Sequence, residues 1–126
     1  MLTNKSMRLI DYASKYAHKS VGKNIHVSLL VIRNKVISAG FNNYLKTHPK
    51  GPINRLQFLH SELDCIRRFN FRENNISRAT LYNFRFSRRN LNKLLLSKPC
   101  LECDKLCNVF GIRKIIYSSP EGMVEC

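Results

Sequence analysis

Two short segments, far apart along the chain, contain the residues that most restrict how it can fold. The first is His60-Ser61-Glu62 and the second is Pro99-Cys100-Leu101-Glu102-Cys103. One imidazole and two thiolates suit Zn²⁺, and a site with three protein ligands keeps the fourth tetrahedral position open, as catalytic zinc sites do. If His60, Cys100 and Cys103 bind one ion, the fold must bring together residues that are 40 positions apart.

Both segments lie where helices are predicted to begin. The helix that contains His60-Ser61-Glu62 is predicted from the apolar spacing of Leu59, Leu63, Ile66 and Phe69. Pro99 suits the first turn of the second helix, which we expect to run to about Phe110 and to end at Gly111. Cys100 and Cys103 then lie on one helical turn, where unsatisfied N–H groups and the positive end of the dipole favour thiolate over thiol.

The rest of the pattern predicts one α/β domain over residues 1–126, in which helices cover a sheet. Helices are expected at residues 6–19, 59–69 and 99–110. Strands are expected at residues 25–32, 36–41, 79–86 and 112–117, with a last short strand at 123–126. Two connections stand out. Residues 42–57 form a long polar loop, and residues 87–98 form a basic segment with one turn of helix around Leu91 to Leu96.

Glu62 follows His60 by two residues, and an open zinc site does not need it as a fourth ligand. Zn²⁺ lowers the pKa of water to about 7, so hydroxide is available at neutral pH. A carboxylate beside that hydroxide can act first as a general base and then as a general acid. This is the chemistry of hydrolytic deamination, in which hydroxide adds to the C–NH₂ carbon of a heterocycle and the amine leaves as ammonia.

These segments resemble the H-x-E and P-C-x-x-C signature of the cytidine deaminase-like superfamily of zinc-dependent deaminases. The resemblance implies a three-layer α-β-α fold, with a mixed sheet of four to five strands and helices on both faces. It also implies that His60, Cys100 and Cys103 hold Zn²⁺ and that Glu62 is the catalytic proton shuttle.

The same resemblance suggests substrate-binding residues. Asn42 follows the second expected strand and resembles the asparagine that contacts the sugar in related enzymes, with Asn43 as the alternative. Ser61 and Pro99 are further substrate-binding candidates within the two segments. Ser61 stands where the family usually has Ala or Val, and this small residue leaves the metal site intact.

Positive charge dominates the chain. It has 22 Lys and Arg against 8 Asp and Glu, which gives a formal net charge of +14. Compositional bias could supply the Lys residues but explains the Arg residues poorly. A field of this sign attracts polyanions or phosphorylated small molecules. Contacts to phosphate or nucleic acid are therefore expected from Arg85, Arg88, Arg89, Lys93 and Lys98.

Cysteine usage indicates a reducing compartment. The five cysteines are an odd number, and the first five residues lack the apolar core of a signal peptide. We therefore expect a cytoplasmic protein without a membrane-spanning segment. Cys65 and Cys107 are interpreted as core residues, with a third thiolate ligand as the alternative for Cys107. Asp64 is interpreted as a first-turn acid that complements the helix dipole.

Three functions are compatible with these features. The first is a hydrolytic deaminase that converts the cytosine of cytidine or deoxycytidine, as nucleoside or nucleotide, to uracil. An antiparallel last strand after Pro120-Glu121-Gly122 would resemble the free-nucleoside cytidine deaminases and some toxin-type deaminases, and not the deoxycytidylate or tRNA-adenosine branch. The second is an editing deaminase acting on C or A in single-stranded DNA or RNA, and the third is a non-enzymatic zinc module. Small deaminases of this fold often assemble so that a neighbour completes the pocket, which makes a homo-oligomer a further expectation.

Overall fold

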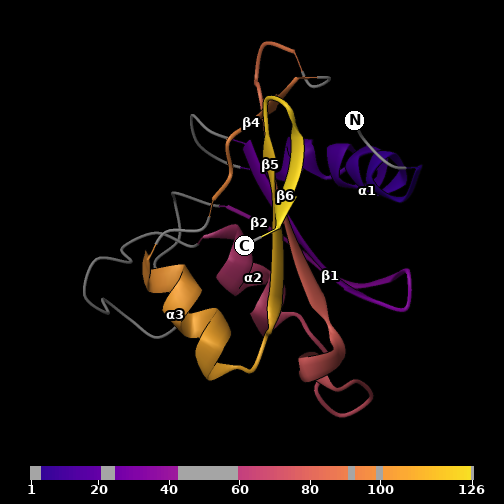
Figure 1. Ribbon diagram of the computed structural model, residues 1–126, viewed down its shortest axis with the longest axis vertical. Coiled ribbons are helices and arrows are strands. Elements are labelled where there is room, and N and C mark those ends of the chain that lie inside the picture. The colour runs from indigo at the N-terminus through magenta and orange to yellow at the C-terminus, as the bar shows by residue number, and fades with distance from the viewer. Residues whose placement is uncertain (1–3, 21–24, 43–59, 91–92, 99–100, 126) are drawn as a thin grey trace.

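A computed structural model of the chain describes residues 4–20, 25–42, 60–90, 93–98 and 101–125 (Figure 1). The long loop expected at residues 42–57 lies almost wholly outside this part, as do Pro99 and Cys100. The helices are α1 (Asn4–Ser14), α2 (Ser61–Arg67) and α3 (Leu101–Val109), with 3₁₀ turns at Ala17–Lys19 and Ile76–Arg78. The strands are β1 (Ile25–Ile32), β2 (Lys35–Phe41), β3 (Thr80–Phe86), β4 (Leu94–Leu95), β5 (Lys114–Ser119) and β6 (Gly122–Glu125).

The strands form one mixed sheet in the order β2-β1-β3-β5-β6, with β4 paired to the end of β3. Only β3 and β5 pair in parallel among the described strands, and the other pairs are antiparallel. The connection between β3 and β5 contains α3, as a parallel pair requires a long crossover. The last hairpin, β5–β6, is antiparallel as predicted.

The β1–β2 hairpin shows how local sequence determines this part of the fold. Its two-residue loop is Arg33-Asn34, because Ile32 pairs with Lys35. Both loop residues have positive φ, 50° for Arg33 and 65° for Asn34. Positive φ at both positions defines the turn whose twist matches that of the strands, and Asn tolerates it well. The strands expected at residues 25–32 and 36–41 are therefore confirmed as the two strands of this hairpin, and β2 begins one residue earlier than expected.

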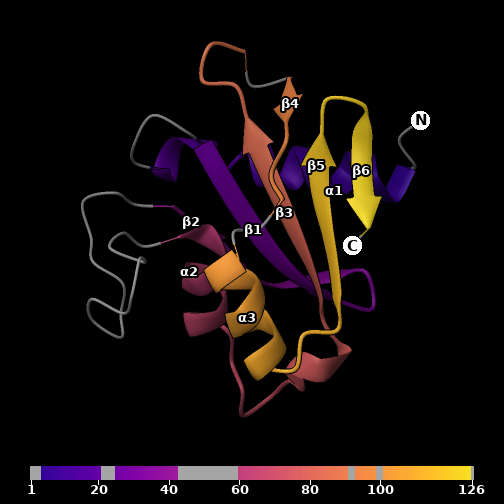
Figure 2. The same ribbon diagram turned by 60° about the vertical axis from the view of Figure 1, so that its left-hand side comes forward.

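Helices cover both faces of the sheet, with α1 on one side and α2 and α3 on the other (Figure 2). Alternate residues of the strands supply two separate cores. The α1 side contains Leu9, Ala13, Val27, Leu29, Phe84 and Phe86, and the other side contains Leu30, Cys65, Ile66, Leu81, Cys107 and Ile115. The three-layer α-β-α architecture is confirmed, and the sheet has one strand more than the four to five expected.

The extra strand is the main error of the sequence-based prediction. A turn of helix was expected around Leu91 to Leu96, but Leu94 and Leu95 instead pair with Phe86 and Arg85. Ser97 extends this contact to β5, since Ser97 N–H donates to Ser118 O at 3.0 Å and Ser118 N–H donates to Ser97 Oγ at 2.8 Å. These long-range hydrogen bonds outweigh the local helical tendency of the leucines.

The first helix is also shorter than expected. The spacing predicted a helix over residues 6–19, whereas α1 ends at Ser14 and a separate 3₁₀ turn follows at Ala17–Lys19. The Ser14 hydroxyl donates to Asp11 O at 2.8 Å, a local bond that competes with continuation of the helix. Ala13 and Ala17 both remain buried against the sheet, so the predicted apolar face is retained.

Candidate active site

His60-Ser61-Glu62 lies at the N-terminus of α2, as the sequence predicted. His60 is the N-cap residue with an extended backbone, φ −85° and ψ 152°, and its carbonyl accepts the Asp64 N–H at 3.0 Å. Ser61 and Glu62 form the first turn and are buried, with exposed fractions of 2% and 8%. A carboxylate this buried, two residues after a histidine, is unusual outside a functional site because charged groups are rarely buried without a role.

A glycine in β2 allows α2 to lie very close to the sheet. A Cβ at Gly40 would be 2.2 Å from the Cys65 backbone nitrogen and 2.5 Å from the Ser61 carbonyl oxygen. Any side chain at this position would therefore displace α2. Beside this contact, the Ser38 hydroxyl donates to the Cys65 carbonyl at 2.7 Å. The absence of a side chain at Gly40 therefore lets the first turn of α2, which contains Glu62, lie against β2.

Asp64 ties the same helix to the end of β2. Its side chain is 1% exposed and accepts the Phe41 N–H at 3.0 Å through Oδ2. The guanidinium Nε atoms of Arg67 and Arg68 donate to Asp64 Oδ1 at 2.8 and 3.1 Å. Asp64 was expected only to complement the helix dipole, and that interpretation was incomplete. The pairing of a buried carboxylate with a strand N–H could not be read from the local sequence.

Ser61 connects the catalytic candidate Glu62 to the sheet. Its hydroxyl donates to Glu62 Oε1 at 3.0 Å and lies 2.8 Å from the Ser28 hydroxyl on β1. The Ser28 hydroxyl in turn donates to Asn83 Oδ1 on β3 at 2.6 Å. Ser28 and Asn83 are functional candidates that the sequence analysis did not identify, because they lie within apolar strand patterns.

Asn42 lies where β2 leads into the site. It is 2% exposed, and its Oδ1 accepts the His26 N–H at 3.0 Å and the Ser20 hydroxyl. His26 is the cross-strand partner of Arg85. Burial, and then the positive charges of Arg85 and His60, lower the pKa of His26 to about 4. His26 is therefore a half-buried neutral imidazole whose cross-strand neighbour is Arg85.

The cysteine segment leads into α3, which packs with α2 on the same face of the sheet (Figure 2). Cys103 lies in the first turn of α3, and its side chain, like the whole of Pro99 and Cys100, lies outside the described part. Among the described side chains no group of three metal-binding residues occurs. The donor types fit Zn²⁺ by their chemistry, because the segments that lead into α2 and α3 contain one histidine and two cysteines.

Cys107 and Cys65 are buried in the apolar core between these helices and the sheet, both with an exposed fraction of 0%. Burial raises the pKa of the Cys65 thiol above its ordinary value. Cys65 Sγ donates to the Ser38 carbonyl at 3.4 Å. Both cysteines therefore have the environment predicted for core residues.

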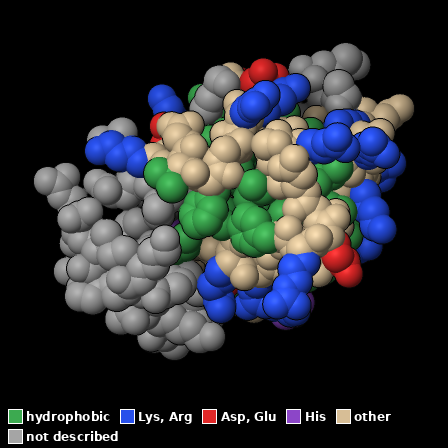
Figure 3. Space-filling model, turned by 90° about the horizontal axis from the view of Figure 1, so that it is seen from below, with side chains coloured by type: hydrophobic (Ala, Val, Ile, Leu, Met, Phe, Trp, Pro, Cys, Tyr) green, Lys and Arg blue, Asp and Glu red, His purple; other side chains and the backbone are tan. Residues whose placement is uncertain are grey.

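Most of the basic candidates lie on the surface between β3 and α3. Arg88, Arg89, Lys93 and Lys98 are exposed, and Arg85 is half-buried. Residues 87–90 extend beyond the end of the sheet, whereas Lys98 follows β4 on the way to α3 (Figure 1). Lys and Arg also surround an apolar centre on the lower face of the molecule (Figure 3). The described surface thus bears the positive charge that the composition predicted.

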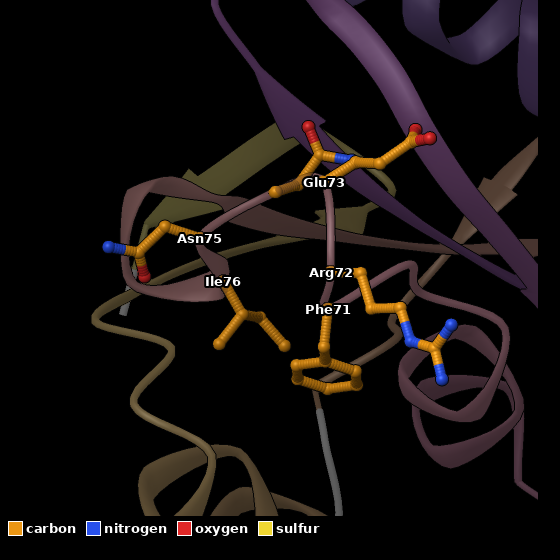
Figure 4. A pocket seen from close by; sticks show the side chains of 6 residues that line it. Phe71, Arg72, Glu73, Asn75 and Ile76 are labelled. Atoms are coloured by element: carbon orange, nitrogen blue, oxygen red, sulfur yellow. The ribbon is translucent and has the colours of Figure 1, made fainter.

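Two hollows occur at the C-terminal end of α2, away from Glu62. One of about 410 Å³ is lined by residues 71–76, and Phe71 and Ile76 lie on its near side (Figure 4). The other, of about 480 Å³, adjoins it and is bordered by Ile32, Lys35 and Arg78. Neither contains a residue that the sequence selected for catalysis or binding.

Comparison with known proteins finds one family profile that covers most of the chain. The profile of the family described as "Cytidine and deoxycytidylate deaminase zinc-binding region" matches residues 3–119. A search of curated proteins found no match. No helix in the described residues is long and apolar enough to cross a membrane.

Solved structures with the same fold include the dCMP deaminase of cyanophage S-TIM5. Its apo form has a TM-score of 0.64 at 16% identity, with 94% of this chain and 86% of that chain covered. Its complex with dCMP and dUMP has a TM-score of 0.61 at 16% identity, with 88% and 78% covered. A diaminohydroxyphosphoribosylaminopyrimidine deaminase/reductase from Thermotoga maritima has a TM-score of 0.54 at 18% identity, and the match covers 90% of this chain but 29% of that one. These similarities confirm the fold class.

Proposed function

Because the chain belongs to the cytidine and deoxycytidylate deaminase zinc-binding family, we propose that it converts the cytosine of a nucleoside or nucleotide to uracil with release of ammonia. The observation that carries this proposal is the buried Glu62 in the first turn of α2, two residues after His60 and within the matched region. The family gives the reaction class, and the position of this carboxylate gives the residue that would perform it.

We propose that His60, Cys100 and Cys103 hold the zinc ion. When bound, Zn²⁺ supplies Lewis-acid activation of water at neutral pH. His60 is suited to this role because the N-cap position places it beside the first turn, and its backbone is fixed by the bond from the Asp64 N–H. Cys103 lies in the first turn of α3, where the dipole favours a thiolate.

Glu62 would perform the proton transfers. Its carboxylate would take one proton from the attacking water and deliver it to the cytosine ring nitrogen, and would then take the second proton, from the added hydroxyl, and deliver it to the departing amino nitrogen. One water is consumed, the C–NH₂ bond breaks, and ammonia leaves while the ring carbon gains a carbonyl oxygen. Burial to 8% exposure keeps bulk water away from this carboxylate, which strengthens its interactions with a bound base.

The substrate-binding residues are proposed from their position, burial and hydrogen bonds. We propose Asn42 as the sugar contact, because it is buried at the end of β2 and held by hydrogen bonds from His26 and Ser20. Ser61 and Pro99 are proposed to line the base pocket. Arg85 is proposed as the basic candidate that meets a substrate phosphate, because it is half-buried and is the cross-strand partner of His26, whose pKa His60 also lowers.

A second candidate function is deamination of C or A in single-stranded nucleic acid. It is favoured by the exposed Arg88, Arg89, Lys93 and Lys98, which lie between β3 and the N-terminus of α3. A polymer whose base entered the site could place its phosphates along these cations. The two functions differ in substrate but share the same site.

A product screen tests the proposal. Purified protein would be incubated with cytidine, deoxycytidine, their monophosphates and single-stranded oligonucleotides of DNA and RNA. Uracil formation from at least one monomer supports the leading function, and uracil or hypoxanthine formation from oligonucleotides alone supports the second. Absence of any product from a folded protein that contains zinc would contradict both.

A further inference from the structure

A continuous row of buried polar side chains links the sheet to Glu62. It consists of Asn83 on β3, Ser28 on β1, and Ser61 and Glu62 at the start of α2. The successive contacts are 2.6 Å from Ser28 Oγ to Asn83 Oδ1, 2.8 Å between the two serine hydroxyls, and 3.0 Å from Ser61 Oγ to Glu62 Oε1. All three distances are within hydrogen-bond range.

Strand register places this row under α2. Ser28 and Asn83 are cross-strand partners, and Gly40 is opposite Ser28 on the other neighbouring strand. Because Gly40 has no side chain, the first turn of α2 approaches closely enough for Ser61 to reach Ser28. Ser28 is 0% exposed and Asn83 is 3% exposed, so these groups are held without competition from bulk water.

Proton counting shows what the row needs in order to donate to an ionised Glu62. Each serine hydroxyl has one proton, but there are three contacts. Rotating the side-chain amide of Asn83 by half a turn exchanges its oxygen and nitrogen, which occupy nearly the same space, and places the NH₂ group beside Ser28. Asn83 then donates to Ser28, Ser28 to Ser61, and Ser61 to the Glu62 carboxylate, with one proton for each contact.

We propose that Ser61 is a positioning residue that fixes the orientation of the Glu62 carboxylate, with Ser28 and Asn83 holding Ser61 in turn. This inference rests on the proposed deaminase function. The hydroxyl limits the rotation of a carboxylate that must alternate between water, ring and leaving amine. An alanine at this position could not form the hydrogen bond to Glu62.

The test compares kcat and KM for Ser61→Ala, Ser28→Ala and the double variant with those of the wild type. We expect Ser61→Ala to lower kcat about tenfold, in the range for a hydrogen bond to a charged group, with unchanged zinc content and an effect on KM smaller than that on kcat. Ser28→Ala should lower kcat by a smaller factor, and this factor should disappear in the Ser61→Ala background because Ser28 acts through Ser61.

Ser38→Ala is the matched control. Ser38 is also a buried serine on the sheet, and it bonds to the same helix through the Cys65 carbonyl, but it has no contact with Glu62 among the described bonds. It should lower stability and leave kcat unchanged. An unchanged kcat in Ser61→Ala, independent effects of Ser28 and Ser61, or an equal loss in Ser38→Ala would overturn the proposal.

A crystal structure of Ser61→Ala provides a readout that needs no activity. Glu62 should occupy one rotamer in the wild type and more than one in the variant. A single unchanged rotamer in the variant would overturn the positioning role even if the protein had another substrate. Failure of the product screen, by contrast, would reject the proposed function and leave this crystallographic comparison valid.

Discussion

At the scale of single residues, the cysteines on α2 and α3 have different environments although they are the same type of residue. Cys65 and Cys107 are buried in an apolar core, whereas Cys103 begins a helix. The sequence allowed this distinction, because only Cys100 and Cys103 combine helix-start spacing with a preceding proline. It did not identify Ser28 and Asn83, whose contact with Ser61 requires strand register that local patterns do not contain.

Zinc content tests the division between ligand and core cysteines. Purified wild-type protein should contain about one zinc per chain, and Cys100→Ser should lose most of it. Cys107→Ser should keep its zinc, because the Cys107 side chain packs in the core. Metal analysis of the two variants measures this directly. Equal loss from both would indicate a closed site with four protein ligands and would favour the structural zinc module.

His26 predicts a pH dependence of stability. Its pKa is about 4 in the folded protein against 6.5 when exposed, so the unfolded state binds the proton more readily. The stabilisation from neutral His26 is present above pH 6.5 and is lost as pH falls towards 4, by about 2–3 kcal/mol. Denaturant unfolding at pH 7.5 and pH 5 should show a smaller loss in His26→Gln than in the wild type. An equal loss in both proteins would rule out this role of His26.

At the scale of elements, close packing of α2 on β2 determines where the catalytic turn lies. The β1–β2 hairpin was predictable because its turn and strands depend on adjacent residues. Strand β4 was not, because two leucines form a strand here only through pairing with β3 and through the contact between Ser97 and Ser118. The close approach of α2 to Gly40 could not be predicted from the sequence either, because a glycine at a strand end has several ordinary explanations.

Gly40→Ala tests that packing. The new Cβ would lie 2.2 Å from a backbone nitrogen of α2, so the helix must move, and we expect a loss of about 3 kcal/mol or more in the free energy of unfolding. Gly111→Ala is the control, because its Cβ meets nothing within 4 Å and only the positive φ of 85° opposes it. That variant should lose about 1–2 kcal/mol. Equal losses in denaturant unfolding would contradict the packing explanation.

At the scale of the whole molecule, positive charge and the location of the site together determine which substrates are attracted. The excess of 22 basic over 8 acidic residues was evident from the sequence. Its distribution was only partly predictable: Arg88 and Arg89 were grouped with Arg85, but they lie on an exposed extension while Arg85 is half-buried beside His26. Charge alone therefore favours phosphate in general, and the fold separates the half-buried Arg85 from the exposed Arg88 and Arg89.

Salt dependence separates monomer from polymer substrates. Binding of a single strand weakens with log salt at a slope of about −0.7 per phosphate contact, so four contacts would cost more than tenfold between about 50 and 200 mM salt. A monophosphate should show a slope of about one contact or less. Replacing Arg88 and Arg89 together with Ala should barely change monomer turnover. A steep slope with an oligonucleotide, and no turnover of monomers, would promote the editing function.

Glu62→Ala tests the proposed deaminase most directly. The variant should fold and hold zinc like the wild type, since the ligands His60, Cys100 and Cys103 are retained. Removal of its proton transfers should lower the rate of uracil formation by a factor of at least about 10²–10⁴. The measurement is uracil and ammonia release from cytidine and deoxycytidine substrates by both proteins at matched zinc content. We predict that the wild-type protein releases uracil product and ammonia in equal amounts, at a rate far above that of Glu62→Ala. Undiminished activity of a folded Glu62→Ala would contradict the mechanism.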